Sequence, residues 1–322
     1  MKINLGIIGL GNIYEFQKRA LETTVSINIA AICDTDEHKA YSEAKKLNVE
    51  YYTDYNQLLK NPKIDAVLLS TPVLTHHEIG INVLKAKKHL LIEKPAAINL
   101  QQLHHMQDTA ISNGVLLITA YHAAFARDLL WFKDMHEEFT EKLGPITGID
   151  CKFFDPYIIN GELDSKAISL AGSWIDSGIN ALSVVLQIIK PHSIKLKDNH
   201  LINDNSYASP NIGADVVFEA TVNKEKFDIN IKTDWTMNKN LKVTIIYFDK
   251  TNHKIILHHS NQQVIMVDNL KQESVIADFS SLDERLIAHY KGVFNDFINR
   301  LQSNRDNFEF TLKTHTLLLK TY

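Results

Sequence analysis

The sequence predicts an α/β protein: an N-terminal Rossmann domain with a doubly wound parallel sheet, then an α+β domain with a large, mostly antiparallel open sheet. Three observations support this prediction. Short, nearly continuous apolar segments alternate with helical patterns up to residue 119, as in parallel sheets that are covered on both faces. Residues 2–34 follow the order strand, glycine turn, helix, strand and acid, which is the order of a dinucleotide-binding βαβ unit. Beyond residue 122, alternating segments typical of antiparallel strands predominate.

The first domain, expected over residues 1–122, binds NAD(P) in this interpretation. Asp54 and Asn99 are expected to cap helices, Pro62 breaks the helix that Asp54 begins, and Gly114 ends the helix that Asn99 begins. The expected strands are 2–8, 27–33, 64–69, 89–92 and 115–119, and the expected helices start after Gly11 or cover 38–47, 56–60, 77–87 and 100–113.

The second domain, expected over residues 123–322, binds the substrate in this interpretation. A bridging helix at 124–139 leads through a Gly-Pro turn into a strand at 146–153, and a further helix lies within 172–189. The polar stretch 197–211 is expected to be a long surface loop. The remaining strands are expected at 214–222, 226–236, 241–248, 254–259 and 263–267, and a final amphipathic helix at 283–301.

The glycine turn that follows the first strand carries a nucleotide-binding pattern. Gly9 allows a tight turn, and Gly11 lets the backbone approach a pyrophosphate at the positive end of the next helix. Asp34 stands where a carboxylate accepts hydrogen bonds from the adenosine ribose. The third glycine of the fingerprint is replaced by Tyr14, so the helix is expected to pack differently there.

Polar residues also follow the later strands of this domain. Ser70 and Thr71 end one strand, and Glu93-Lys94-Pro95 ends the next. Because ligands of parallel sheets bind beyond the carboxyl ends of the strands, we expect these residues to line one crevice with the glycine turn. Pro95 restricts Lys94 to an extended or turn conformation that points side chains into this crevice. The alternative is a Lys–Glu pair on a solvated loop.

In the second domain, Asp176 and Asn180 lie four residues apart and share one face of the expected helix. A carboxylate and a carboxamide presented together suit the binding of vicinal hydroxyls. The alternative is that Asp176 is an ordinary helix N-cap.

Together these segments resemble the Gfo/Idh/MocA family of oxidoreductases over nearly the whole chain. The resemblance rests on G-x-G-N-I at residues 9–13, the acid at 34, T-P at 71–72, E-K-P at 93–95 and D-x-G at 176–178. Most members carry His where this chain has Asn180. D-x-G-I-N-A-L at 176–182 is similar to the L-arabinose/D-galactose 1-dehydrogenase branch, which oxidises the anomeric hydroxyl of a pyranose to a lactone.

The resemblance implies roles for the residues that match. Lys94, Asp176 and Asn180 are the expected catalytic residues: Lys94 orients the C1 oxygen and the nicotinamide ribose, Asp176 is the partner or base, and Asn180 holds the sugar hydroxyl. An asparagine cannot accept a proton as His does, but an anomeric hydroxyl is acidic enough for a weaker base. The expected cofactor contacts are Gly9, Gly11, Asn12, Ile13, Asp34, Ser70, Thr71, His76, Glu93 and Lys94.

Charge argues for NAD as the cofactor, because Asp34 repels a 2′-phosphate, although the neighbouring Lys39 leaves NADP possible. His76 matches a frequent histidine of the family near the cofactor, and His122 resembles a crevice histidine that touches the sugar. Trp174 is a candidate for stacking on the sugar, with core packing as the alternative. Adjacent histidines point apart and no acid or cysteine cluster supports them, so no metal site is expected.

Composition excludes several other classes. The net charge of −4 offers no basic stripe for nucleic acid, and no apolar run approaches the roughly 20 residues that span a membrane. Two cysteines and a start without an export pattern favour a cytoplasmic protein. By analogy with the family, a homodimer or homotetramer is expected.

Three hypotheses for function follow. The first is an NAD-dependent enzyme that removes hydride from C1 of an aldose and gives the aldonolactone. The second is an NAD(P)-dependent dehydrogenase of a ring secondary alcohol in inositol or another sugar or polyol. The third is a sensor that binds NAD(H) without turnover.

Overall fold

The structure is a computed structural model that describes residues 2–249 and 252–322. The chain folds as two compact units. One contains Met1–Tyr121 and Tyr290–His315, and the other contains His122–His289 and Thr316–Tyr322. Residue 1, where the expected first domain begins, lies outside the described residues. The expected domain boundary near residue 122 stays a prediction, and in the structure the C-terminal segment Tyr290–His315 lies in the first unit.

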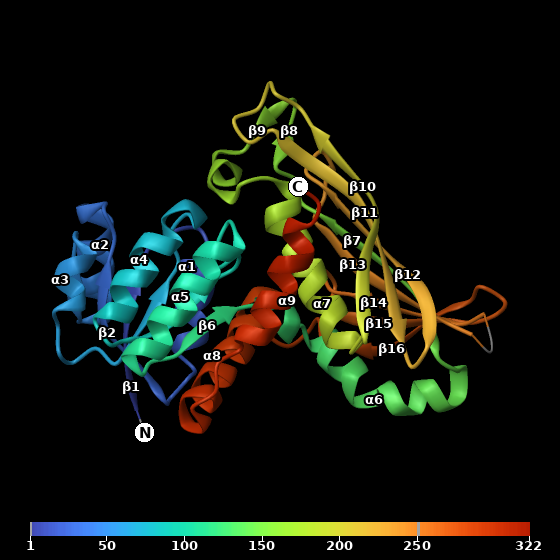
Figure 1. The fold of residues 1–322 in the computed structure, drawn as a ribbon, viewed down its shortest axis with the longest axis horizontal. Helices are drawn as coiled ribbons and strands as arrows, with labels where there is room; N and C mark the ends of the chain where they lie inside the picture. The colour runs from blue at the N-terminus through green and yellow to red at the C-terminus, as the bar shows by residue number, and fades with distance from the viewer. Residues whose placement is uncertain (1, 250–251) are drawn as a thin grey trace. The chain divides into compact units, whose positions relative to one another are not determined.

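The first unit holds a six-stranded parallel sheet in the order β3-β2-β1-β4-β5-β6 (Figure 1). β1 lies between β2 and β4, so the chain reverses its direction of winding there, as in doubly wound folds. The predicted Rossmann sheet is therefore confirmed. Its strands are β1 (Ile3–Ile8), β2 (Ile27–Cys33), β3 (Glu50–Tyr52), β4 (Ala66–Leu69), β5 (His89–Glu93) and β6 (Leu117–Ala120).

Helices follow the strands of this sheet and bury their apolar faces on it. The apolar side chains of α3, α4 and α5 form one buried cluster with alternate residues of the strands. Asp36, Asp54 and Asn99 accept hydrogen bonds at the starts of α2, α3 and α5, and Gly114 ends α5 in the left-handed conformation. The helices are α1 (Tyr14–Leu21), α2 (Glu37–Leu47), α3 (Tyr55–Leu59), α4 (Val73–Lys85) and α5 (Leu100–Asn113).

The second unit holds an eight-stranded sheet in the order β10-β11-β12-β7-β13-β14-β15-β16, antiparallel except between β12 and β7 (Figure 1). Fully buried side chains alternate with half-buried ones along β7, β11 and β12, so one face forms the core. The predicted α+β domain with a large, mostly antiparallel sheet is confirmed. The strands are β7 (Ile146–Phe154), β10 (Ser193–Asn203), β11 (Asn211–Val222), β12 (Glu225–Asp234), β13 (Leu241–Phe248), β14 (Lys254–His258), β15 (Gln263–Val267) and β16 (Glu273–Asp278).

Helices of the second unit cover the buried face. α7 (Ile179–Ile188) packs on β7, and α6 (Arg127–Leu143) packs on β14 and β15. α7 is apolar almost all round, which explains why it is buried on every side. Short elements complete the unit: the 3₁₀ helices His122–Phe125 and Ser165–Leu170 and the hairpin of β8 (Ile158–Ile159) and β9 (Glu162–Leu163).

The predicted loop at 197–211 is wrong in its first half. Residues 197–203 belong to β10, which pairs with β11 at the edge of the sheet, whereas residues 204–210 do form a loop. All side chains of β10 are exposed or half-buried, because among the described strands it pairs with β11 alone. Polar residues on an edge strand protect it from pairing with other chains, and they gave this strand the composition of a loop.

The C-terminal region also differs from the prediction. The helix expected last, α8 (Arg285–Ser303), is followed by another, α9 (Phe308–Leu319). The apolar side of α8 is buried at Tyr290, Phe294 and Phe297, and Asn307 bonds to the backbone of Thr119 in β6. These contacts explain why residues 290–315 belong to the first unit.

Candidate functional site

The glycine turn after β1 requires Gly9. Its φ of +94° is a conformation that side chains disfavour, and an added Cβ would lie 2.6 Å from the carbonyl oxygen of Ser70. The backbone N–H of Gly9 donates to Cys33 at the end of β2. The turn is thus pressed between the ends of β2 and β4.

Gly11 is not required by the fold of the described residues. A Cβ added there would come no closer to the protein than 3.9 Å, at the Ser70 carbonyl, so the fold itself has room for a side chain. Asn12 is exposed, Ile13 is half-buried, and α1 begins at Tyr14 with no side-chain cap among the described residues. Open space in front of uncapped backbone N–H groups fits a pyrophosphate.

Asp34 connects the glycine turn to the end of β2. One carboxylate oxygen accepts the Leu10 N–H at 2.8 Å, and the other accepts the Asp36 N–H at 3.0 Å. These bonds fix the carboxylate and leave further lone pairs for ribose hydroxyls. Its negative charge is held next to the turn, where it disfavours a 2′-phosphate.

Tyr14, in place of the third glycine, fastens α1 to α2. Its hydroxyl donates to Glu43, which also accepts hydrogen bonds from Lys18 and Lys46. Burial, with the Glu43 carboxylate, raises the pKa of Tyr14. The missing glycine is therefore replaced by a buried polar contact between two helices.

A chain of buried hydrogen bonds crosses the carboxyl ends of β4 and β5. Glu93 Oε1 accepts from Gln17 Nε2 at 2.8 Å and from the Tyr290 hydroxyl at 2.6 Å, and Gln17 also bonds to the Ser70 hydroxyl. Burial raises the pKa of Glu93, while Tyr290, Lys94 and Gln17 oppose this. The solvated-loop alternative is therefore wrong, since Glu93 is only 7% exposed.

Two of the residues expected to contact the cofactor belong to this chain of bonds. Ser70 and Glu93 use their side chains to hold α1, β4, β5 and α8 together, so their geometry supports a positioning role. Lys94, directly after Glu93, is half-buried at the end of β5 and remains the candidate for chemistry. Gln17 and Tyr290 were missed by the sequence interpretation, although a glutamine on the apolar face of a helix was a detectable signal.

His76 joins the two loops that carry Thr71 and Lys94. Its Nδ1 lies 2.9 Å from the Pro95 carbonyl oxygen and its Nε2 lies 2.9 Å from that of Thr71. Burial lowers the pKa of His76, although hydrogen bonds to both carbonyls oppose this. With its ring occupied by backbone, His76 supports the cofactor end by fixing these loops.

In the second unit, Asp176 and Asn180 lie on an irregular turn. Residues Trp174–Gly178 form a π-helix that continues into α7, so Asp176 is part of the helix and not its N-cap. Single π-turns are frequent at functional sites. Asn180 Nδ2 donates to the Asp176 carbonyl at 3.2 Å, whereas its Oδ1 accepts no hydrogen bond from the described part of the chain.

Trp174 anchors this turn to the core. The indole is fully buried, donates from Nε1 to the Leu318 carbonyl and packs so closely on Gly178 that a Cβ there would lie 2.5 Å away. Its backbone N–H donates to Asn211 at 2.8 Å. These contacts favour the core-packing alternative over stacking on a sugar.

The second unit contains further buried or half-buried polar groups. His122 stacks on His289 with their Nδ1 atoms 3.4 Å apart, and burial holds the pKa of His289 well below its ordinary value. Burial raises the pKa of Tyr157, and the carboxylates of Asp176 and Asp155 add to this. Burial lowers the pKa of half-buried Arg285, and the carboxylates of Asp155 and Asp128 oppose this. The sequence interpretation missed Arg285.

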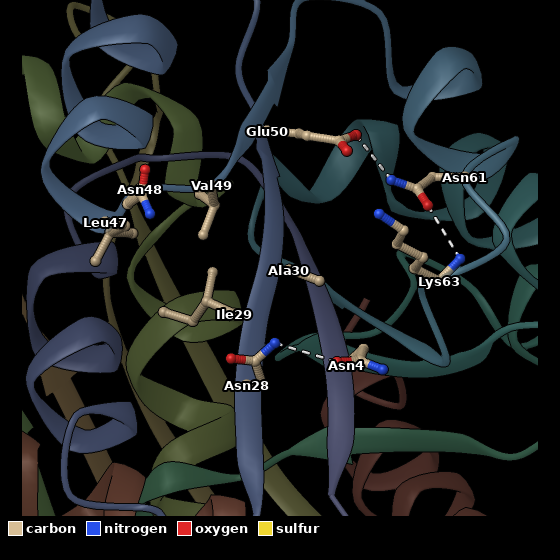
Figure 2. Close-up of a pocket in the computed structure, with 10 residues that line it drawn as sticks. All are labelled: Asn4, Asn28, Ile29, Ala30, Leu47, Asn48, Val49, Glu50, Asn61 and Lys63. Carbon is tan, nitrogen blue, oxygen red and sulfur yellow. Dashed lines mark hydrogen bonds between the residues drawn. The ribbon is translucent and has the colours of Figure 1, made fainter.

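A hollow of about 540 Å³ in the first unit lies elsewhere (Figure 2). Asn4 and Asn28 line it at the beginnings of β1 and β2, opposite the end that carries the glycine turn. Its polar side chains bond to one another, as between Asn28 and Asn4 and between Asn61 and Glu50. It is therefore not the cofactor site.

Residues 2–249 and 252–322 contain neither a metal-binding group of side chains nor a membrane-spanning helix. No three His, Cys, Asp or Glu side chains are grouped to hold a metal ion, and no helix is long and apolar enough to cross a membrane. Cys33 and Cys151 are both buried and free.

The family model GFO_IDH_MocA, described as an oxidoreductase family with an NAD-binding Rossmann fold, matches residues 3–121. The match covers the strands and helices of the first unit up to the start of the second. The glycine turn, Asp34 and the uncapped start of α1 agree with the NAD binding that the family description gives. The L-arabinose/D-galactose branch does not occur among the relatives described next.

Curated relatives match part of the chain. The myo-inositol 2-dehydrogenase of Thermotoga maritima is 33% identical over 139 residues, 43% of this chain and 42% of the relative. The D-glucoside 3-dehydrogenase of Escherichia coli is 26% identical over 203 residues, 62% of this chain and 57% of the relative. The chain thus spans about two fifths of the first of these relatives.

Solved structures match the whole fold. A probable dehydrogenase from Thermotoga maritima has a TM-score of 0.78 at 22% identity, covering 99% of this chain and 96% of its own. An oxidoreductase from Agrobacterium radiobacter, solved with NAD⁺, L-tartaric acid and magnesium, has a TM-score of 0.80 at 17% identity, covering 99% and 94%. At these identities the likeness concerns the fold.

The two glycines of the turn should respond differently to alanine. Gly11→Ala should leave the melting temperature unchanged and weaken NADH binding at least tenfold, about 1.4 kcal/mol, because the added methyl occupies space that only a ligand needs. Gly9→Ala should lower the melting temperature, because its Cβ meets Ser70 in the protein itself. Fluorescence titration with NADH and thermal melts measure both; unchanged NADH affinity in Gly11→Ala would contradict the assignment.

Proposed function

We propose that the protein is an NAD-dependent dehydrogenase that removes hydride from C1 of an aldose and forms the aldonolactone. Asn180 carries this proposal. Its buried Oδ1 accepts no hydrogen bond within the described chain, and a buried acceptor without a partner costs about 1–3 kcal/mol. A sugar hydroxyl that donates to this oxygen removes that cost, and the adjacent Asp176 supplies a second acceptor.

The expected cofactor residues provide for NAD. Gly9 permits the tight turn, Gly11 leaves space for the pyrophosphate, and Asp34 presents its carboxylate to the adenosine ribose. The same carboxylate favours NAD over NADP. The nicotinamide, when bound, accepts a hydride.

The protein's own residues then act on the substrate. Lys94 orients the oxygen on the reacting carbon and stabilises the negative charge that develops there. Asn180 holds a neighbouring hydroxyl. As the C–H bond breaks, the O–H electrons form the C=O bond, and the proton goes to the Asp176 carboxylate or to water. No histidine takes part in this step.

The identity of residue 180 favours C1 over other carbons. Loss of hydride from an ordinary secondary alcohol needs a competent base, for which histidine is suited near neutral pH. Asparagine cannot accept the proton. An anomeric hydroxyl is more acidic than an ordinary alcohol, so Asp176 or water suffices.

A second candidate is oxidation of a ring secondary alcohol. It is favoured by the relatives, which are named for inositol C2 and glucoside C3 oxidation. Under this alternative Tyr157 and Arg285 place a ring hydroxyl, and Asp176 is the base. A third possibility, an NAD(H) sensor without turnover, leaves the half-buried Lys94 without a role. We also expect a homodimer or homotetramer.

A panel of candidate substrates distinguishes these three functions. NAD⁺ and NADP⁺ reduction with pentoses, hexoses and inositols should show turnover of an aldose with NAD⁺, and mass spectrometry should find the lactone and then the aldonic acid. A ketosugar would establish the second candidate instead. Tight NADH binding without turnover of any panel member would leave only the sensor.

Lys94→Ala should lower kcat at least 100-fold with NADH affinity nearly unchanged, because Lys94 acts at the reacting oxygen.

Residue 180 is tested by Asn180→His. Histidine supplies a proton acceptor but loses the carboxamide oxygen, so aldose kcat/KM should fall at least tenfold and activity on ring secondary alcohols should rise relative to it. Steady-state kinetics with the best aldose and with myo-inositol give this ratio. An unaltered ratio would contradict the substrate contact assigned to Asn180.

A further inference from the structure

Asp155 and Lys242 form a buried ion pair in the second unit. Lys242 Nζ lies 2.6 Å from Asp155 Oδ2, and both side chains are less than 10% exposed. Asp155 directly follows β7, and Lys242 lies in the neighbouring β13. Burial lowers the pKa of Lys242, and the Asp155 carboxylate opposes this.

The same carboxylate holds the turn that carries Asp176. Ser177 donates its hydroxyl to Asp155 Oδ2 at 2.8 Å, and Asn240 donates to the other oxygen at 2.8 Å. Ser177 is fully buried and lies inside the π-helix, directly after Asp176. Ser177 therefore makes a direct link between the ion pair and the turn.

Stability alone does not explain this pair. Burying two charges costs several kcal/mol per ion, and well-packed apolar residues often replace such pairs without loss. A carboxylate with donors on three sides has one defined position, and so does the hydroxyl that it accepts. The pair therefore supplies a fixed point next to the π-turn.

We propose that Asp155, held in place by Lys242, is a positioning residue that fixes the Asp176–Asn180 turn through Ser177. The inference rests on the proposed function of Asp176 and Asn180. Catalytic groups must be held within about 0.5 Å of their productive geometry, and a 1 Å misplacement can cost about 100-fold in rate. A π-turn departs from the regular α-helical hydrogen-bond pattern, so a hydrogen bond from Ser177 to Asp155, which lies outside the helix, helps to fix the conformation of the turn.

Ser177→Ala tests the link with the smallest change. Because Ser177 has no exposed surface, it does not touch the substrate, and its loss acts only through the turn. The variant should lower kcat/KM for the sugar at least tenfold and leave NADH affinity within about twofold. Ser173→Ala is the matched control: it removes a fully buried hydroxyl from the same segment that has no hydrogen bond among the described residues.

The ion pair itself is tested by Lys242→Met and by the double variant Asp155→Asn/Lys242→Met. The single variant leaves an uncompensated buried carboxylate, so both the melting temperature and kcat/KM should fall. The double variant is neutral and still offers an amide oxygen to Ser177, so it should recover most of both. Ser177→Cys retains a weak hydrogen-bond donor of similar size, so its kcat/KM should lie between the values of the wild type and Ser177→Ala. Ser177→Gln is not a useful variant, because Ser177 is fully buried and a larger side chain has no room.

The outcomes separate two failures. Wild-type turnover together with equal kcat/KM in Ser177→Ala and Ser173→Ala would overturn the positioning role and leave the proposed function intact. Absence of turnover by the wild-type protein across the panel would overturn the proposed function and this inference with it.

Discussion

The buried carboxylate of Glu93 holds together the carboxyl ends of β4 and β5, the end of the sheet at which we propose that the cofactor binds (the cofactor end). It ends β5, and it accepts hydrogen bonds from Gln17 on α1 and Tyr290 on α8. Through Gln17 it also fixes Ser70 at the end of β4, the residue against which Gly9 is pressed. A buried carboxylate without these donors would be costly, so the three elements are held together. Within the E-K-P sequence, Glu93 thus serves placement, and Lys94 is the residue left for chemistry.

In the second unit, too, some polar side chains hold the backbone in place while another is proposed to contact a ligand. Ser177 and Trp174 are bonded to the surrounding core, and they hold the π-turn in place. The side-chain oxygen of Asn180 has no such partner among the described residues. Ser177 and Trp174 therefore position the turn. Ser173 also has an unpartnered hydroxyl among the described residues, but it is fully buried, whereas Asn180 keeps some exposed surface and is the group for which we propose a ligand. This contrast is the basis on which Asn180, and not Trp174, is assigned to the substrate.

Local patterns predicted the parts of the fold that local physics determines. The strand–turn–helix order of residues 2–34, the caps Asp54 and Asn99 and the stop at Gly114 are all present, because each depends on neighbours in sequence. β10 was missed because an exposed edge strand is as polar as a loop. The spaced motifs agree with the match of residues 3–121 to the Gfo/Idh/MocA family model, whereas the relatives named above do not include the predicted branch.

The candidate site was predicted less completely, since its supporting residues are distant in sequence. Tyr290 reaches Glu93 across 197 positions, and Lys242 reaches Asp155 across 87. No periodicity connects such pairs, so Gln17, Tyr290, Asp155 and Lys242 became visible only in three dimensions. The protein partners of Ser70, His76 and Glu93 were hidden for the same reason, and their expected cofactor contacts stay predictions.

The role of Glu93 is tested most directly by a double-mutant cycle between Glu93→Gln and Tyr290→Phe, in which the dissociation constant of NADH is measured for each variant. If the bond between these side chains organises the cofactor end, each single variant weakens NADH binding and the double variant is little worse than the weaker single. The coupling should be at least about 1 kcal/mol. Additive losses, with no coupling between the two positions, would contradict the central role of Glu93.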